Sequence, residues 1–384
     1  MQKKIPHSSP IHPSTHPPIH LSTHPPIHPS THPLPMSLTP DLPTAHQAFQ
    51  AFTDRIPPTA SVVALHDSDA DGVTAGVVWQ RAFERAGYQQ VRRVIPDRER
   101  NAWTKANREQ LAETKPDFLF VMDLGSQAEP VLEGIPTCFI DHHHPKGVPA
   151  GDTLISAYTW EPIPNTSWMV WHLCHAIADV SDFDWIAAIG TLSDLGDRAP
   201  FDLLTQAKRK YTAKYLKEAT ALINASRRAA EYHPELAAIA LLTHPDPKSL
   251  VNSTRPEVEQ LRQDRETVKR ELEAARKVAP IFAGKVALLR LNSPCQIHPL
   301  IAQSWRSRLP NYVVIAANEG YLPNRINFSA RSNSLNVLEF LRAQSIDAGE
   351  GNYGNGHDQA SGGSLPRDRW QQLLTQMGFS KLNS

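Results

Sequence analysis

Three features are scarce in this chain of 384 residues. Cysteine occurs only three times, at Cys138, Cys174 and Cys295, and the absence of a CxxC spacing argues against disulfides and a cysteine zinc site. No run approaches the roughly 18 apolar residues of a membrane helix, and the amino terminus lacks the apolar segment of a signal peptide. Lys+Arg and Asp+Glu balance at 39 each, so no strong overall field steers the chain towards nucleic acid. We therefore expect a cytoplasmic protein with buried thiols and no membrane partner.

The first 35 residues form a low-complexity repeat. From His12 to His32 a histidine recurs every four residues among Pro, Ser, Thr and Ile. Such a tract cannot bury enough apolar surface to fold, so we expect residues 1–35 to be disordered. Because the repeat stops just before Met36, we interpret it as a mis-assigned start and Met36 as the true one. The alternative is a functional metal-binding histidine tail.

Residues 61–76 carry the densest group of candidate metal ligands. The apolar, β-branched run 62–65 predicts a buried strand, and a helical pattern begins at Val73. Between them lie His66, Asp67, Asp69 and Asp71. Carboxylates that follow a parallel strand lie where open α/β sheets bind ligands, and their mutual repulsion favours a divalent cation. The plainer alternative is a helix cap, which needs one aspartate and not three with a histidine.

The same alternation of strand and helix continues after this stretch. Apolar runs at 91–95, 118–122 and 137–140 predict strands, and 105–113 predicts a helix between them. Strands separated by helices form parallel sheets, and their nearly continuous apolar character is typical of strands covered on both faces. The length leaves room for a second domain. We therefore predict an α/β fold with a parallel sheet.

Two more of these strands also end in acidic or histidine residues. Asp123 follows the strand 118–122, and Asp141, His142 and His143 follow the strand 137–140. A buried-looking helix from residue 185 leads to Asp194. Together these side chains predict a basin of carboxylates and imidazoles. Its oxygen-rich donor set suits Mn²⁺ or Mg²⁺ better than a structural zinc.

The second half of the chain begins with helices and then repeats the alternation. Residues 201–280 are helical and highly charged, and an apolar stripe along 256–279 predicts a rigid connector between domains. Strands are predicted at 286–291, 312–317 and 325–330, and helices at 299–309 and 335–343. We therefore predict a smaller α/β domain over residues 281–384.

A glycine-rich stretch, 349–363, is predicted to be a loop that follows these elements. Glycines allow backbone amides to approach an anion closely, and His357 adds a donor or a charge. Taken alone, an ordinary surface turn explains the stretch equally well.

The motifs, taken in order, resemble those of the DHH phosphoesterases, in particular RecJ-like proteins. The resemblance covers about residues 60–200 and rests on the motif at 67–72, Asp123, the triplet 141–143 and Asp194. It implies a DHH catalytic domain at 36–200, a helical connector at 201–280 and a DHH-associated substrate-binding domain at 281–384. Ser329, Arg331 and the glycine-rich stretch resemble the substrate-holding elements of that second domain, although Asn355 replaces a usual glycine.

The resemblance also implies a role for each site residue. The implied ligands of two Mn²⁺ ions, with Mg²⁺ as the alternative metal, are Asp69, Asp71, Asp123, His142 and Asp194. Asp123 is expected to bridge both ions, whereas His66 and Asp67 are left open as further ligands. His143 is expected at the scissile phosphate, and Asp141 orients the imidazoles. The implied substrate-binding residues are Arg331, Gly354, Gly356 and His357.

The implied function is a Mn-dependent phosphodiesterase or exonuclease that cleaves short single-stranded nucleic acid with water activated by two metal ions. Two enzymatic alternatives stay open: an oligoribonuclease/pAp phosphatase and a cyclic dinucleotide phosphodiesterase. A catalytically inactive binding module is a third alternative, but every ligand position holds the expected Asp or His. The sequence does not choose between RNA and DNA, and it gives neither polarity nor oligomeric state.

Overall fold

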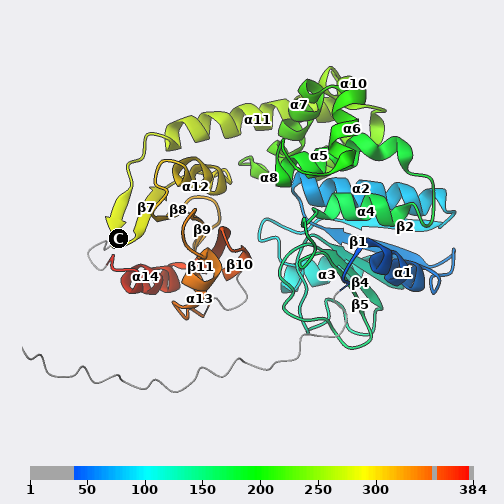
Figure 1. Ribbon diagram of the computed structural model, residues 1–384, viewed down its shortest axis with the longest axis horizontal. Helices are drawn as coiled ribbons and strands as arrows, with labels where there is room; N and C mark the ends of the chain where they lie inside the picture. The colour runs from blue at the N-terminus through cyan, green and yellow to red at the C-terminus, as the bar shows by residue number, and fades with distance from the viewer. Residues whose placement is uncertain (1–38, 348–352, 380–384) are drawn as a thin grey trace, which may run out of the picture. The chain divides into compact units, whose positions relative to one another are not determined.

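The computed structural model describes residues 39–347 and 353–379, with Asn355 and His357 described by their backbone only (Figure 1). The repeat at 1–35 and the proposed start at Met36 lie outside the described residues, so the expectations for them stay predictions.

The first sheet has five parallel strands in the order β2-β1-β3-β4-β5. Their bounds are β1 Ser61–His66, β2 Gln90–Val94, β3 Phe118–Met122, β4 Thr137–Asp141 and β5 Thr153–Ser156. Every residue of β1 is buried, as expected for a central strand covered on both faces. The predicted parallel-sheet α/β fold is therefore confirmed. The short strand β5 was not predicted, because four residues between polar segments give little periodicity.

Alternate residues of β1 belong to the hydrophobic cores on the two faces of this sheet. Val62 and Ala64 pack in one core with residues of α1 and α2, whereas Val63 and Leu65 pack in another with Leu111 of α3. The helices of this part are α1 Leu42–Thr53, α2 Ala70–Arg85, α3 Lys105–Glu113, α4 Thr166–Cys174 and α5 Asp184–Leu195, with a 3₁₀ turn η1 at Ser181–Phe183. Helices on both faces are what a parallel sheet requires, since neither face can remain exposed to water.

Most of the predicted connector packs against α2 and α5, two of the helices of the first part. It contains α6 Asp202–Tyr211, α7 Ala213–Ile223, α8 Ala225–Arg228, α9 Pro234–Thr243, α10 Pro247–Val251 and α11 Pro256–Ala275. Leu204, Leu241 and Leu261 belong to the same core as Val62. Further along α11, Val268 belongs to a core of the second sheet. Helix α11 thus contributes side chains to a core of each sheet. The domain boundaries at 200 and 280 stay predictions.

The second sheet is mixed, with six strands in the order β10-β11-β9-β8-β7-β6. Its strands are β6 Ile281–Ala283, β7 Val286–Leu291, β8 Val313–Asn318, β9 Arg325–Arg331, β10 Tyr353–His357 and β11 Ala360–Pro366, and its helices are α12 His298–Arg306, α13 Val337–Arg342 and α14 Arg367–Gln376. Among the described strands of this sheet, only β7 and β8 pair in parallel. This sheet and its helices confirm the predicted second α/β part.

The predicted loop at 349–363 is wrong from residue 353 onwards, because β10 and β11 form a hairpin there. Glycines usually weaken strands, which is why the sequence indicated a loop. At Gly362 the close approach of another backbone explains the glycine: an added Cβ would lie 2.3 Å from the carbonyl oxygen of Phe328 in β9.

Two expectations from composition can be compared with the structure. The three cysteines are free and buried, as predicted. Among the described residues, no helix combines the length and the apolar character that crossing a membrane requires.

Candidate metal centre

The acidic residues converge because β1, β3 and β4 are parallel neighbours whose carboxyl ends share one edge of the sheet. Within the described part of the chain, the ligand atoms form three groups, and the atoms of each group lie within 4.8 Å of one another. The groups are Asp123, Asp141, His142 and His143; Asp71, His142 and Asp194; and Asp67, Asp69 and Asp123. Asp123 and His142 each belong to two groups, so the three groups form one continuous centre.

Asp69 combines a structural role with a place in this centre. It is the N-cap of α2, where its Oδ1 accepts hydrogen bonds from the backbone N–H groups of Asp71 (3.0 Å) and Gly72 (3.1 Å). Its Oδ2 lies 3.5 Å from guanidinium nitrogens of both Arg100 and Arg227. Burial would raise the pKa of Asp69, but these two cations hold it below its usual range. The cap uses one oxygen and leaves the other facing the centre.

Asp71 is fixed by the amino terminus of α4. Its Oδ1 accepts hydrogen bonds from Asn165 Nδ2 (2.5 Å) and Ser167 N (2.7 Å), and its Oδ2 accepts one from Thr166 N (3.0 Å). Asn165 is held in turn by Thr191 Oγ1, which donates to Asn165 Oδ1 (2.9 Å). These donors stabilise the charged carboxylate and fix its orientation.

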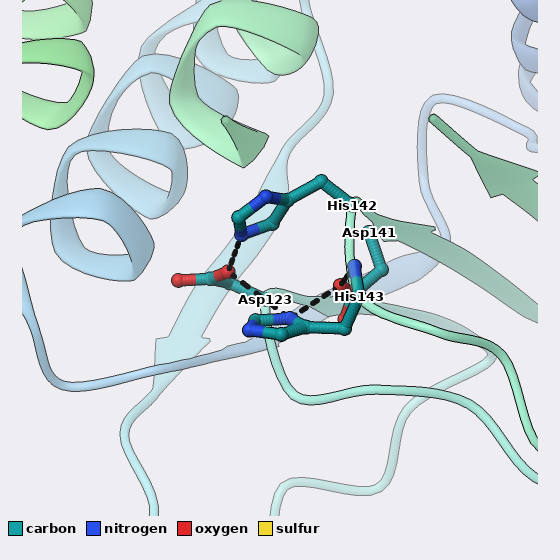
Figure 2. A group of neighbouring side chains, drawn as sticks. All are labelled: Asp123, Asp141, His142 and His143. Atoms are coloured by element: carbon teal, nitrogen blue, oxygen red, sulfur yellow. Dashed lines mark hydrogen bonds and ion pairs between the residues drawn. The ribbon is translucent and has the colours of Figure 1, made fainter. Parts of the chain in front are cut away.

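His142 faces three carboxylates with one ring nitrogen. Its Nε2 lies 3.3 Å from Asp123 Oδ1, 3.8 Å from Asp194 Oδ2 and 3.9 Å from Asp71 Oδ2. Figure 2 shows the ring of His142 pointing towards Asp123. Asp123 follows β3 with a left-handed φ of 64°, a conformation that aspartate and asparagine tolerate better than most residues. This backbone conformation places the Asp123 carboxylate beside the other members of both ligand groups to which Asp123 belongs.

His143 forms a tight pair with Asp141 (Figure 2). Its Nδ1 lies 2.7 Å from Asp141 Oδ1, and the same oxygen accepts the backbone N–H of His143 (2.7 Å). Burial lowers the pKa of His143, but the Asp141 carboxylate outweighs it and raises the pKa to about 9. The second ring nitrogen, Nε2, is therefore the atom that can donate to another group.

The residues present fit a divalent cation. Burial and the Asp194 carboxylate raise the pKa of Asp71 to about 7. Burial and the Asp71 carboxylate raise the pKa of Asp123 well above its usual range. Both shifts mark carboxylates with too little positive charge nearby, and a divalent cation supplies that charge. Oxygen donors with a single imidazole suit Mn²⁺ or Mg²⁺.

A cavity of about 920 Å³ opens at this centre. The first part of the chain contributes Asp67, Asp123 and His143 to its lining. Positive charge comes from Arg98, Arg100, Lys146 and Arg342, and the second sheet contributes Ser329, Gly356, Gly362, Gly363 and Ser364. Carboxylates and imidazoles therefore meet cations and exposed backbone in one cavity, an arrangement suited to an anionic substrate bound beside a metal ion.

Not all of the predicted substrate-binding residues line the cavity. Gly356 lines the cavity, whereas Gly354 lies in the same strand but is not part of the lining. Arg331 Nη1 donates to Ser329 Oγ (2.7 Å) and to the carbonyl oxygens of Ala330 (3.0 Å) and Ser361 (3.1 Å). The side chain of His357 lies outside the described residues. The substrate-binding assignments stay predictions.

The structure does not bring His66 into the centre. Its Nδ1 lies 2.8 Å from the carbonyl oxygen of Asp67, and its Nε2 lies 3.3 Å from Arg93 Nη1. Burial and the Arg93 cation lower the pKa of His66 to about 3. The ring packs so closely on α2 that a Cβ at Gly76 would lie 2.2 Å from it. As the last residue of β1, His66 is turned towards the helix by strand alternation, whereas Asp67 is turned towards the cavity.

Sequence reasoning missed several residues of the centre. Asn165 precedes the apolar residues of α4 as an N-cap, so its position was open to prediction from capping preferences. Arg100 and Arg227 carry no such signal, because they are two of many charged residues in polar segments. Only the folded chain shows that both lie beside Asp69.

Comparison with known proteins identifies this region. Residues 61–191 match the model of the DHH family, N-terminal domain. No curated protein matches the chain. Among solved structures, RecJ in complex with Mn²⁺ from Thermus thermophilus is similar, with a TM-score of 0.64 and 17% identity over 88% of this chain and 55% of that chain. This chain thus spans about half the length of that protein.

Two other solved structures are similar over most of their own length. An exonuclease RecJ bound to manganese has a TM-score of 0.58 and 17% identity, over 88% of this chain and 95% of that chain. The DHH domain of a protein that is described as a member of a ribosomal protein family has a TM-score of 0.64 and 16% identity, over 89% of this chain and 90% of that chain. At these identities the matches establish a shared two-part fold.

Proposed function

Because residues 61–191 match the DHH family of phosphoesterases, we propose that this chain is a metal-dependent phosphodiesterase that removes nucleotides from the end of short single-stranded nucleic acid. The observation that carries the proposal is the convergence of three ligand groups, joined through Asp123 and His142, beside a cavity whose lining includes Asp67, Asp123 and His143. A structural metal site would have no need of an adjoining cavity with cationic and glycine-rich walls.

The proposed metal is Mn²⁺, as two ions, with Mg²⁺ as the alternative. The residues assigned to them are Asp69, Asp71, Asp123, His142 and Asp194. Asp123 is assigned to both ions because it belongs to two of the ligand groups. Bound divalent cations supply Lewis acidity that polarises a phosphoryl oxygen and acidifies water.

His143 is the proposed partner of the reacting phosphate. Asp141 holds its Nδ1 at 2.7 Å, so the proposed hydrogen bond from His143 to a phosphoryl oxygen is made by Nε2. With a pKa raised to about 9, His143 is protonated at neutral pH and offers positive charge as well as a hydrogen bond. Positive charge that is already in place beside the oxygens lowers the barrier to attack on phosphorus, because these oxygens gain negative charge in the transition state. Asp141 acts through His143 and is a positioning residue.

The size of the cavity favours a short substrate or a chain end. At about 920 Å³ it falls within the range of small-molecule and nucleotide pockets, roughly 300–1,000 Å³. In the proposal, the second sheet holds a terminal or adjacent phosphate through Arg331 and the hairpin backbone at Gly356. The same volume would accept a dinucleotide or a bisphosphorylated nucleotide, which keeps the oligoribonuclease/pAp phosphatase alternative in the test.

A panel assay tests this proposal. The protein, freed of metal with a chelator and resupplied with Mn²⁺ or Mg²⁺, is incubated with single-stranded DNA and RNA of graded length, dinucleotides, cyclic dinucleotides, pAp and polyphosphate. We expect release of mononucleotides from short single strands, dependent on added metal. Cleavage confined to pAp, cyclic dinucleotides or polyphosphate would replace the proposed substrate, and full activity in chelator would contradict the metal mechanism.

A further inference from the structure

Both carboxylate oxygens of Asp67 are already engaged by donors of the chain. Oδ1 accepts hydrogen bonds from Arg100 Nε (2.6 Å) and from the backbone N–H of Ser68 (2.6 Å). Oδ2 accepts one from Arg100 Nη2. This is the two-pronged pairing of guanidinium with carboxylate, and the Asp67 side chain is only 4% exposed. A metal ion at Asp67 would have to displace or share these donors.

Arg100 is held in place by more than this pair. Its backbone has a left-handed φ of 53°, a conformation that costs a non-glycine residue roughly 1–2 kcal/mol. Its Nη2 also lies 3.5 Å from Asp69 Oδ2, so the guanidinium lies beside two carboxylates. The cavity lining nevertheless includes Arg100, whose side chain is 27% exposed. The guanidinium is therefore anchored on one edge, in a side chain that is partly exposed and lines the cavity.

We infer that Asp67 is not a metal ligand but the anchor of Arg100, and that Arg100 is a fixed positive charge that contacts the substrate phosphate. The inference rests on the proposed function for the identity of the substrate. It accounts for a contrast within one motif: Asp71 is bonded by neutral donors and leaves its charge to be balanced by a cation, whereas a guanidinium already balances the charge of Asp67. An anchored guanidinium presents a planar donor array to a phosphate with little loss of side-chain entropy.

Metal affinity separates an anchor from a ligand. Mn²⁺ binding is measured by calorimetry for the parent, Asp67→Asn, Arg100→Gln and the double variant. In Asp67→Asn the guanidinium of Arg100 is released, and it can pair with Asp69 and compete there with Mn²⁺. Weaker Mn²⁺ binding by this single variant is therefore expected whether Asp67 is an anchor or a ligand. In the double variant that competitor is absent, and we expect Mn²⁺ affinity within about threefold of the parent or tighter. If Asp67 is a ligand, the double variant binds Mn²⁺ as weakly as Asp67→Asn, and the inference is wrong.

Phosphate affinity tests the role of Arg100. Inorganic phosphate, titrated in Mg²⁺, should bind Arg100→Gln roughly ten- to a hundredfold more weakly, the usual worth of a charge-assisted hydrogen bond. Arg100→Lys should recover part of the loss because it restores charge but not the planar fork. The double variant should lose no more than Arg100→Gln, since the two residues act as one unit. Unchanged phosphate affinity in Arg100→Gln would remove Arg100 from substrate binding.

The chain offers a matched control. Arg85 and Asp182 form a similar two-pronged pair (2.6 and 2.7 Å) whose arginine side chain is 40% exposed, and neither residue lines the cavity. Arg85→Gln should leave both affinities at parental values. Thermal unfolding verifies that each variant is folded; should Asp67→Asn fail to fold, Arg100→Gln and the double variant still decide. Both titrations proceed without turnover, so a parent that cleaves nothing in the substrate panel would refute the proposed function and leave this test intact.

Discussion

The two walls of the cavity are built in different ways. On the first, the charged side chains of Asp67, Asp123 and His143 follow strands β1, β3 and β4, and other groups hold them, as the pairings of Asp67 with Arg100 and of His143 with Asp141 show. On the second, the lining residues come largely from β9, β10 and β11, and glycines leave much of that surface as backbone. A parallel sheet brings side chains from distant segments to one edge, which suits metal chemistry. An antiparallel hairpin presents regular backbone, which suits a repeating feature such as phosphate.

In the proposed function, the metal centre beside the first wall carries out the chemistry, and the second wall holds the substrate. If this division is right, changes at the metal ligands abolish turnover for every substrate. Changes on the second wall weaken turnover in proportion to how much of the substrate extends beyond the bond that is cleaved.

The largest effect is expected for Asp123→Asn. Asparagine tolerates the left-handed φ of 64° at this position, so the substitution removes charge without the backbone strain that alanine would add. Because Asp123 is assigned to both ions, turnover on every substrate should fall by several orders of magnitude. In chelator at pH 7 the variant should be at least as stable as the parent, since the buried carboxylates no longer repel one another.

Activity in excess Mn²⁺ and thermal unfolding in chelator measure the two halves of this prediction. Asp194→Asn, on α5, provides the comparison from a different element and should lose turnover similarly. Near-parental activity of either variant in excess Mn²⁺ would remove that residue from the metal centre. A large loss of stability would instead give it a structural role.

The first wall was largely predictable from the sequence, whereas on the second wall strand β9 was predicted and the hairpin of β10 and β11 was not. Strand β3 has the predicted bounds and β1 and β4 differ by one or two residues, because buried parallel strands appear as short apolar runs ended by polar residues. Ligand candidates followed from that, since a residue just after such a strand lies at the sheet edge. The hairpin of β10 and β11 was not predicted because glycines usually indicate a loop. Gly362 is required here by the close backbone of β9, a contact that only the fold reveals. His66 shows the limit on the first wall, where strand alternation and not spacing decides which side chain faces the cavity.

An intermediate effect is expected for Arg331→Ala, which removes a side chain that donates to Ser329 of the second wall. A lost charge-assisted contact to phosphate is worth about 1.5–3 kcal/mol, which is roughly ten- to a hundredfold in kcat/KM on a short oligonucleotide. Most of the change should appear in KM if the contact is equally strong in the ground and transition states. The loss should shrink on bis-p-nitrophenyl phosphate, which has no second phosphate.

The measurement is a paired kinetic comparison of parent, Arg331→Ala and His357→Ala on both substrates. The variant Arg325→Ala is a control from the other end of β9, where the side chain bonds to Ser364. Its kcat/KM ratio between the two substrates should equal that of the parent. Equal losses on both substrates for Arg331→Ala would place Arg331 in the chemical step and break the division between the walls.

The smallest effect is a pH dependence of stability that reports the burial of His298 and the positive charge around it; His298 is the first residue of α12 and part of the cavity lining. Burial, followed by the cations Arg331, Arg227 and Arg100, lowers its pKa to about 3. A histidine whose folded pKa lies below its unfolded value of about 6.5 resists protonation in the native state, so stability is full above pH 6.5 and declines as the pH falls towards 3. At pH 5 the decline from His298 is about 2 kcal/mol, at 1.36 kcal/mol per pH unit.

Urea unfolding at pH 7, 6 and 5 should therefore show a smaller decline in the free energy of unfolding for His298→Gln than for the parent, whereas the exposed His175→Gln should follow the parental curve. Parallel curves for all three proteins would mean that His298 accepts a proton readily in the folded protein, and that neither its burial nor the three arginines disfavour the charged imidazole.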